Sequence, residues 1–205
     1  MSAPDPARLS PKTIVAFIAD IFARRGAEAY MGEPVTISEH MLQCAECAEK
    51  EGAGDALVAA ALLHDIGHFT NEFPDDAAEQ NIDAHHEEAG ARVLERFFPA
   101  IIHDCVRYHV DAKRYLCATD PAYFSKLSEA SIHSLNLQGG PMSPAEVELF
   151  AENPHLEAIL KVRIWDDIGK DPATKAPDFE HYRPLLERVV RAQAASLAAG
   201  QQGAG

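Results

Sequence analysis

The sequence has no apolar run long enough to cross a membrane. A membrane-spanning helix needs roughly 18 to 20 consecutive apolar residues, and no stretch of this 205-residue chain approaches that length. The first residues, MSAPDPARLSP, also lack the apolar segment of a secretory signal. These absences predict a cytoplasmic protein that has no membrane partner.

Basic residues are scarce. The chain has 18 Lys and Arg against 32 Asp and Glu, which gives a formal net charge of −14. Nonspecific binding of nucleic acid depends on a basic surface that neutralises phosphates. The charge therefore argues against a nucleic-acid partner, whereas it is compatible with a small-molecule substrate.

Cysteine is rare as well, with four residues in the chain. Cys44 and Cys47 form a C-x-x-C pair, a spacing that occurs in zinc and redox sites. No second pair accompanies it, and the segment is predicted to be the middle of a helix. We interpret these cysteines as small helix residues in a reduced chain, so that the ten histidines become the more informative residues.

The apolar pattern predicts an almost entirely helical chain. Apolar residues from Ile14 to Phe22 follow an N-cap at Ser10-Pro11, and Ser143 to Glu146 form a capping box. We find no repeat, linker or convincing strand, and predict one all-α domain over residues 1–205, ordered at 10–197 with a loose tail at 198–205. The predicted helices cover about 11–25, 37–50, 55–68, 83–97, 99–111, 121–135 and 179–197, and two more begin near 144 and 154.

The stretch LLHDIGHF, residues 62–69, places three ionisable groups in an apolar helix. Such groups are costly to bury unless something satisfies them, and imidazole with carboxylate suits iron, zinc, manganese or nickel. His64 and His68 are four residues apart, so we expect them on one side of the helix. Gly67 leaves room for another backbone or a ligand. The stretch predicts a metal site in which Asp65 bridges two ions.

Other candidate ligands lie on other predicted helices. They are His40, His86, His109 and Asp166. With His64 and Asp65 they make six nitrogen and oxygen donors, which gives each of two ions three protein ligands if Asp65 is shared. Spacing makes these residues plausible ligands without demonstrating it. We interpret the remaining histidines as ordinary surface or core residues, namely His85, His103, His133, His155 and His181.

The order His40, His64-Asp65, Asp166 resembles the HD superfamily of metal-dependent phosphohydrolases and related oxygenases. The added His86 and His109 resemble its diiron oxygenase branch. Between about residues 28 and 190 the chain is similar to the phosphonate-cleaving HD-domain oxygenases, most of all to the branch with a trimethylated substrate. The stretches that carry this resemblance are YMGEPVTISEH, ALLHDIGHF, HVDAKRYLC, DPAYFSKLSEAS, LQGGPMS, RIWDDIGKD and HYRPLLERV.

The resemblance implies an HD-domain helical bundle that holds a mixed-valence Fe(II)/Fe(III) pair. It also implies cleavage by dioxygen of the carbon–phosphorus bond of a 1-hydroxy-2-aminoethylphosphonate. His86 is preferred over His85 because H-E-E-A-G matches the family pattern, and Asp166 over Asp167 because it follows Trp165. The implied iron ligands are His40, His64, Asp65, His86, His109 and Asp166.

The same resemblance implies the residues around the substrate. Tyr30 and Glu33 match a mobile segment that covers the irons before substrate arrives, and His68 faces the substrate. The implied phosphonate-binding residues are Lys113, Ser131, Gln138 and Arg163. Their chemistry agrees with this role, because Lys gives a point charge, Arg a planar fork, and Ser and Gln neutral donors.

The identity of the substrate amine stays open between two products. A trimethylammonium group leads to glycine betaine and a primary amine to glycine. The loop FTNEFPDDAAEQNID favours the trimethylated substrate, because carboxylates and aromatic rings suit a quaternary ammonium; its candidate contacts are Phe69, Glu72, Phe73 and Asp83. Two other classes remain as alternatives: a metal-dependent HD phosphohydrolase that uses activated water, and a degenerate ligand sensor. The oligomeric state is not predicted.

Overall fold

The computed structural model describes residues 9–30, 32–72 and 86–202, and within these ranges the fold is all-α, as predicted. The only β-type pairing in those ranges is an isolated bridge between Ala29 and Thr36. No helix in the described part of the chain is long and apolar enough to span a bilayer. The α-helices are α1 (Ile14–Arg25), α2 (Ile37–Lys50), α3 (Asp55–Leu63), α5 (His86–Glu95), α6 (Ala100–Thr119), α7 (Glu129–Leu137), α8 (Pro144–Ala151), α9 (Leu156–Ile168) and α10 (Phe179–Gln202), and the 3-10 helices are η2 (Ile66–Glu72) and η3 (Phe124–Lys126).

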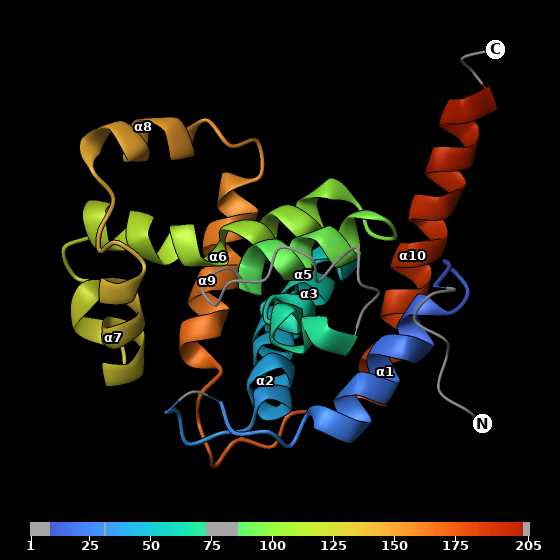
Figure 1. Cartoon of the computed structure of the whole chain (residues 1–205), viewed down its shortest axis with the longest axis horizontal. Helices are drawn as coiled ribbons and strands as arrows, with labels where there is room; N and C mark the ends of the chain where they lie inside the picture. Colours follow the sequence, from blue (N-terminus) through green and yellow to red (C-terminus); the bar gives the residue numbers. More distant parts are fainter. Residues whose placement is uncertain (1–8, 31, 73–85, 203–205) are drawn as a thin grey trace.

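Helix α3 lies at the centre of the molecule. It packs against α2, α6, α9 and α10, while α5 packs against α6 and η2 (Figure 1). The sequence of α3, DALVAAALL, is apolar on every side, as expected for a helix that is surrounded by others. Its residues 58–63 are all buried. The central position of α3 places His64 and Asp65, the His-Asp (HD) pair that follows it, deep in the molecule.

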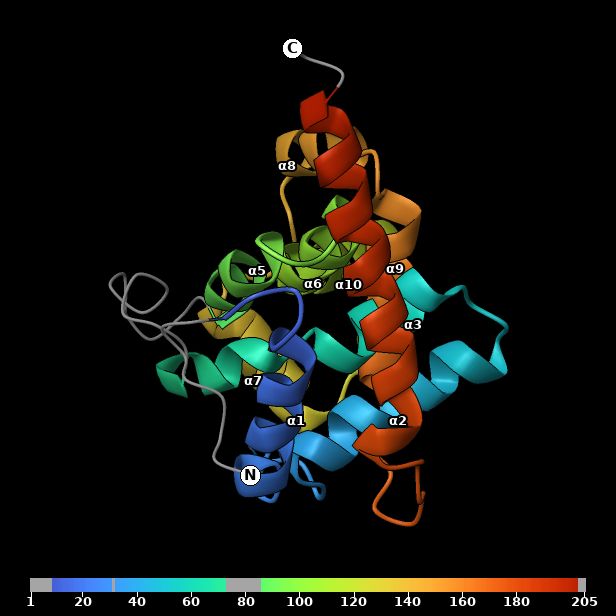
Figure 2. The same ribbon diagram turned by 90° about the vertical axis from the view of Figure 1, so that its right-hand side faces the viewer.

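The other helices surround this centre. Helix α1 packs against α10, and α7 and α8 lie at the opposite end of the molecule (Figure 1). Figure 2 shows α10 running along one side of the bundle, with its C-terminal end beyond the helices packed against it. One large hydrophobic cluster joins α1, α2, α3, α5, α6, α9 and α10. A second, smaller cluster is centred on Tyr123, Leu127 and Leu135.

Several predicted boundaries are confirmed by the structure. Helix α2 spans Ile37–Lys50 as predicted, and the Thr36 side chain accepts a hydrogen bond from the backbone N–H of Glu39 in a capping box. The capping box predicted at Ser143 and Glu146 opens α8. In both places a local side-chain pattern is enough to start a helix.

Other predicted boundaries were wrong. The first helix begins at Ile14 rather than Pro11, because residues 11–13 form a turn. The third helix ends at Leu63, and His68 belongs to η2. The expectation that His64 and His68 lie one α-helical turn apart is therefore incorrect.

Two further boundaries near the C-terminal half also differ from the prediction. The helix expected at 121–135 is divided into a turn, η3 and α7, and α7 starts from an N-cap at Ser128. Helix α6 continues to Thr119, beyond the expected end at 111, because residues 110, 112 and 113 are buried on its inner side. Helix α10 extends to Gln202, beyond the expected end at 197, so residues 198–202 are helical.

Candidate metal centre

The chain turns sharply at His64-Asp65, directly after the central helix. His64 caps the C-terminal end of α3, and η2 begins at Ile66. A Cβ atom on Gly67 would lie 1.8 Å from the carbonyl oxygen of His86, so only glycine permits this contact. The close approach of η2 to the start of α5 brings His86 to the HD pair, which is the role expected for a small residue at position 67.

The structure brings all six predicted ligands into one buried cluster. Their helices are α2, α3, α5, α6 and α9 with the turn after α3. The Nε2 atoms of His40 and His64 lie 3.0 Å apart, and those of His86 and His109 lie 3.2 Å apart. His86 is partly buried, and the other five residues are buried. Residues separated by more than a hundred positions therefore form one donor set.

The two carboxylate oxygens of Asp65 face different histidine pairs. Oδ2 lies 3.5 Å from Nε2 of both His40 and His64. Oδ1 lies 3.3 Å from Nε2 of His86 and 3.4 Å from Nε2 of His109. Asp166 joins the first pair, with Oδ1 3.4 Å from Nε2 of His40. The donors thus divide into a group of four and a group of three around a shared Asp65.

Hydrogen bonds to backbone carbonyls fix the tautomers of three of these imidazoles. The Nδ1 atoms of His40, His64 and His109 lie 2.8, 2.8 and 2.7 Å from the carbonyl oxygens of Gly169, Ala61 and Val106. Each Nδ1–H donates to its carbonyl, so each Nε2 presents a lone pair to the centre of the cluster. Nε2 is the atom that such a histidine offers to a metal.

A cation fits these facing lone pairs. Two ligands that bind one ion at about 2.1 Å in neighbouring positions lie roughly 3 Å apart, which matches both histidine pairs. Oδ2 of Asp65 and Oδ1 of Asp166 are buried and have no hydrogen-bond partner. Unpaired buried carboxylate oxygens are costly. The donor set therefore fits a metal cofactor.

Burial and neighbouring groups shift the pKa values of the four histidines in different directions. Burial lowers the pKa of His64, and lowers that of His109 to about 3. Burial also opposes the charge of His40 and His86. Cys44 and Asp65 outweigh it and raise the pKa of His40, and Asp65 does so for His86. Each facing pair thus combines one histidine whose pKa is raised with one whose pKa is lowered.

Two aromatic side chains cover the cluster. The Tyr30 ring stacks on the His40 ring with centroids 4.2 Å apart. The His68 ring stacks on the His86 ring at 4.4 Å, and Nε2 of His68 lies 3.9 Å from Oδ1 of Asp65. Burial lowers the pKa of His68 to about 4, so that its imidazole is neutral at pH 7. The structure therefore places His68 beside the group of three donors and Tyr30 beside the group of four.

A group of cations lies next to the carboxylates of this cluster. Arg163 contacts Asp166, with Nη1 2.5 Å from Oδ2, and also pairs with Asp167. Nζ of Lys113 donates to Oγ of Ser134 at 2.7 Å. Burial, together with the positive charge of Arg163, lowers the pKa of Lys113 to about 8. Lys113 and Arg163 thus place two basic groups beside the carboxylates of the cluster.

Sequence analysis missed Lys170, which belongs to the same group. Nζ of Lys170 lies 3.1 Å from Oγ of Ser131, 3.3 Å from Oε1 of Glu33 and 3.7 Å from Oδ1 of Asp166. Its position four residues after Asp166 was the available signal, because such a spacing brings two side chains to one face of a helix. A lysine just beyond a helix end gives no stronger indication from sequence alone.

Not every predicted site residue joins the centre. Phe69 is buried in the main core, where it packs against the Phe22 ring and the Arg25 guanidinium. Phe73 and Asp83 lie outside the described residues, as does the side chain of Glu72.

Gln138 caps the C-terminal end of α7, and its buried Oε1 has no hydrogen-bond partner. The other described histidines lie away from the cluster. His155 pairs with Asp104 and His181 with Glu49, in agreement with their interpretation as ordinary residues. His85 is outside the described part of the chain.

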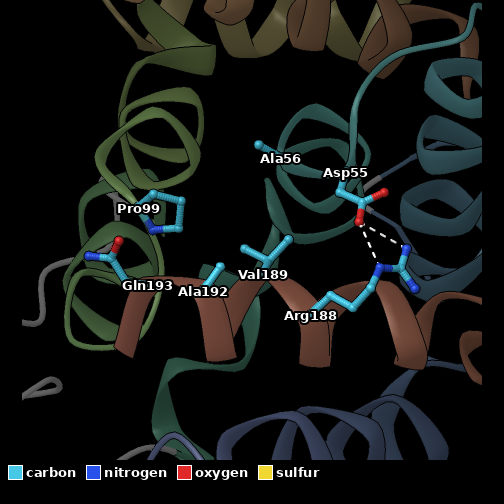
Figure 3. Close-up of a pocket in the computed structure, with 7 residues that line it drawn as sticks. All are labelled: Asp55, Ala56, Pro99, Arg188, Val189, Ala192 and Gln193. Carbon is cyan, nitrogen blue, oxygen red and sulfur yellow. Dashed lines mark hydrogen bonds and ion pairs between the residues drawn. The ribbon is translucent and has the colours of Figure 1, made fainter. Parts of the chain in front are cut away.

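A separate pocket of about 400 Å³ lies between α10 and the N-terminal ends of α3 and α6 (Figure 3). It is lined mainly by apolar side chains and by the Asp55–Arg188 ion pair, whose atoms are 2.9 Å apart. Both partners of that pair are about half exposed. The pocket offers no group of buried donors comparable with the metal centre.

Comparison with known proteins gives a consistent set of relatives. The HD domain family matches residues 37–162. The chain is 56% identical over 190 residues, 93% of its length and 97% of the relative's, to a [1-hydroxy-2-(trimethylamino)ethyl]phosphonate dioxygenase (glycine-betaine-forming) from Leisingera caerulea. It is 41% identical over 164 residues, 78% of its length and 80% of the relative's, to a hydroxymethylphosphonate dioxygenase from Gimesia maris. It is also 34% identical over 171 residues, 82% and 78% of the two lengths, to an uncharacterized protein from Acanthamoeba polyphaga mimivirus.

Proposed function

The chain belongs to the HD domain family, and we propose that it is a dioxygenase that cleaves the carbon–phosphorus bond of (R)-1-hydroxy-2-(trimethylamino)ethylphosphonate. The observation that carries this proposal is the donor cluster divided around Asp65, with Lys113 and Arg163 beside it. A two-metal centre next to an anion site is what a phosphonate oxygenase requires. The identity of 56% with a dioxygenase of that name supports the substrate.

The proposed cofactor is a pair of iron ions in the Fe(II)/Fe(III) state. His40, His64 and Asp166 would hold one ion, His86 and His109 the other, and Asp65 both. Imidazole and carboxylate donors suit iron. When bound, the iron pair supplies the redox chemistry that activates dioxygen and oxidises C1 of the substrate.

The protein's own groups bind and orient the substrate. Lys113 and Arg163 attract the phosphonate, and Ser131 and Gln138 donate neutral hydrogen bonds to its oxygens. Fixing the phosphonate places C1 at the metal centre, where holding the reacting atoms in position contributes strongly to the rate. His68 is neutral at pH 7, and its imidazole can accept a hydrogen bond from the 1-hydroxyl group.

Water is kept from the centre by the segment that carries Tyr30 and Glu33. The Tyr30 ring covers His40, and Glu33 is tied to α7 through a hydrogen bond from Oγ of Ser128 at 2.6 Å. The same two side chains suit a quaternary ammonium, which cannot donate N–H hydrogen bonds and is recognised by rings and carboxylates. The proposed substrate thus has its anionic and cationic ends matched by opposite charges.

The reaction balances with dioxygen as the oxidant. The substrate and one O₂ give glycine betaine, inorganic phosphate and one proton. The C1–H and C1–P bonds break, one oxygen atom completes the carboxylate and the other completes the phosphate. C1 loses its bonds to hydrogen and phosphorus and is thereby oxidised by four electrons, which reduce the dioxygen.

Parallel assays of phosphate release, oxygen uptake and glycine betaine formation test the proposal. We expect equal amounts of all three, with kcat/KM higher for the trimethylated substrate than for the primary amine, and about two irons per chain with a mixed-valence EPR signal. A preference for the primary amine would reassign the substrate and keep the oxygenase. Phosphate release without oxygen, in a protein that holds one zinc, would overturn the oxygenase in favour of a phosphohydrolase.

A further inference from the structure

Lys170 connects three parts of the molecule that meet at the substrate side of the metal centre. Its side chain is 12% exposed and lies just after the end of α9. Nζ donates to Oγ of Ser131 in α7 at 3.1 Å and lies 3.3 Å from Oε1 of Glu33. It also lies 3.7 Å from Oδ1 of Asp166, an oxygen with no hydrogen-bond partner. A nearly buried lysine in this position can bind either a protein carboxylate or an incoming anion.

The positive charge of Lys170 acts on the other cations of the site. Burial is the main cause of the lowered pKa of Lys113, and the charges of Arg163 and Lys170 lower it further. Arg163 is already engaged by Asp166 and Asp167. The mutual repulsion of the three cations is relieved when a doubly charged anion lies among them. A phosphonate dianion has that charge.

Glu33 provides the negative charge of this site in the structure. Its Oε1 accepts a hydrogen bond from Oγ of Ser128 at 2.6 Å and lies 3.3 Å from Nζ of Lys170. A hydroxyl and an ammonium group are the partners that a phosphonate oxygen would also take. Tyr30 belongs to the same segment, and Nζ of Lys170 lies 5.8 Å from its ring centroid. The covering segment is thus held by Lys170 through a carboxylate and a ring.

We propose that Lys170 is a further phosphonate-binding residue, and that the Glu33 carboxylate occupies its anion position until the substrate displaces it. This inference rests on the proposed function, because it assigns the phosphonate to the site beside Asp166. Exchange of Glu33 for the phosphonate frees the carboxylate of Glu33 for the substrate's ammonium group. One lysine thereby couples arrival of the anion to release of the covering segment.

Calorimetric titration of the anaerobic iron-loaded protein with inorganic phosphate tests this exchange. Phosphate has no ammonium group, so only the competing role of Glu33 is measured. Lys170→Met should weaken phosphate binding at least tenfold, and Lys170→Arg should restore part of it. Glu33→Gln should tighten binding about fivefold, because the competing charge is gone. Iron content should stay unchanged in all three variants.

The double variant Lys170→Met/Glu33→Gln tests whether Glu33 and phosphate compete for Lys170. Glu33→Gln should have no effect once Lys170 is absent. Lys161→Met is the matched control, since Lys161 lies on α9, is 52% exposed and pairs with Glu157 on the surface. It should bind phosphate as the unmodified protein does.

Three results would overturn the exchange. They are unchanged binding in Lys170→Met, equal tightening by Glu33→Gln with and without Lys170, or no binding of phosphate by the unmodified protein. Turnover of the phosphonate is measured separately. A protein that cleaves the substrate with oxygen uptake yet gives one of these three results keeps the proposed function and loses only this inference.

Discussion

The metal-binding helices and the segment at 120–142 are built in different ways. The histidines and carboxylates of the metal centre project from α2, α5, α6 and α9 and from the turn after α3. These five helices share one large hydrophobic cluster. The segment at 120–142 contains η3 and α7, and its cluster has three buried members, Tyr123, Leu127 and Leu135. The first region holds its donors through core packing and backbone carbonyls. The second holds Ser131 and Gln138 on a short helix with little core of its own.

The difference matches two tasks, which are metal binding in the first region and substrate binding in the second. Metal ligands must stay within a few tenths of an ångström of their positions, and a large close-packed core provides that rigidity. A substrate has to enter and leave, so its binding groups belong on an element that costs little to displace. Substitutions of the histidines and carboxylates in the first region should therefore change metal content, whereas substitutions of Ser131 or Gln138 in the second should change substrate binding alone.

The largest effect is expected for Asp65→Ala, which removes the carboxylate shared by both groups of donors. Loss of both oxygens should release most of the metal from both positions and lower activity more than a thousandfold, while the helical circular dichroism spectrum is retained. Metal analysis of the purified variant measures this directly. Asp55→Ala, in the distant surface pair with Arg188, is the control. Two irons retained in Asp65→Ala would show that this residue does not bridge.

Gly67→Ala should displace His86 from the metal centre and leave the His40–His64 group in place. The added Cβ would meet the His86 carbonyl at 1.8 Å, so α5 must move and take His86 with it. We expect iron content to fall from two towards one per chain, with activity reduced roughly a hundredfold by the misplaced group.

Gly54→Ala is the matched control for this change. It introduces the same methyl group at a position with no atom within 4 Å and without a positive φ, so it should keep both irons. Full iron content in Gly67→Ala would mean that the close contact does not position His86.

Lys113→Ala should affect the anion site and spare the metal. Loss of a charge-assisted contact worth about 1.5–3 kcal/mol corresponds to a kcat/KM roughly 10 to 150 times lower. Iron content should stay at two per chain.

Arg163→Ala should behave differently, because its guanidinium contacts Asp166 as well. We expect weaker substrate use together with some loss of iron, which would mark Arg163 as the link between the two regions. Unaltered kinetics in both variants would place the phosphonate elsewhere.

The smallest effect is expected when the pH is raised, which should lower kcat/KM. Burial, with help from Arg163 and Lys170, lowers the pKa of Lys113 to about 8, against the opposing charges of Asp166 and Asp167. Lys113 is positively charged below that pH and loses its charge as the pH rises through it. Because kcat/KM reports on the free enzyme, it should fall roughly five- to tenfold between pH 7 and pH 9. Lys113→Arg should flatten this part of the profile, and an unchanged profile would contradict the role of Lys113.

Local patterns predicted the helices well where caps and glycines mark their ends. Thr36 and Glu39 start α2, and the Ser143 box starts α8, because these side chains satisfy backbone groups within one turn. The prediction failed where tertiary contacts overrode the pattern. The helix after Asp55 ends at Leu63, because the chain turns there to bring His64 and Asp65 to the other donors.

The amino-acid sequence by itself determined the all-α class, the central apolar helix and the types of donor at the metal centre. Those properties depend on residue chemistry and on spacings within one helix. Only the tertiary structure decided how Asp65 divides its oxygens between two histidine pairs, why residue 67 must be glycine, and that Lys170 meets Glu33. Each of these depends on contacts between distant segments, and no local periodicity encodes which side chains meet when separate helices pack around α3.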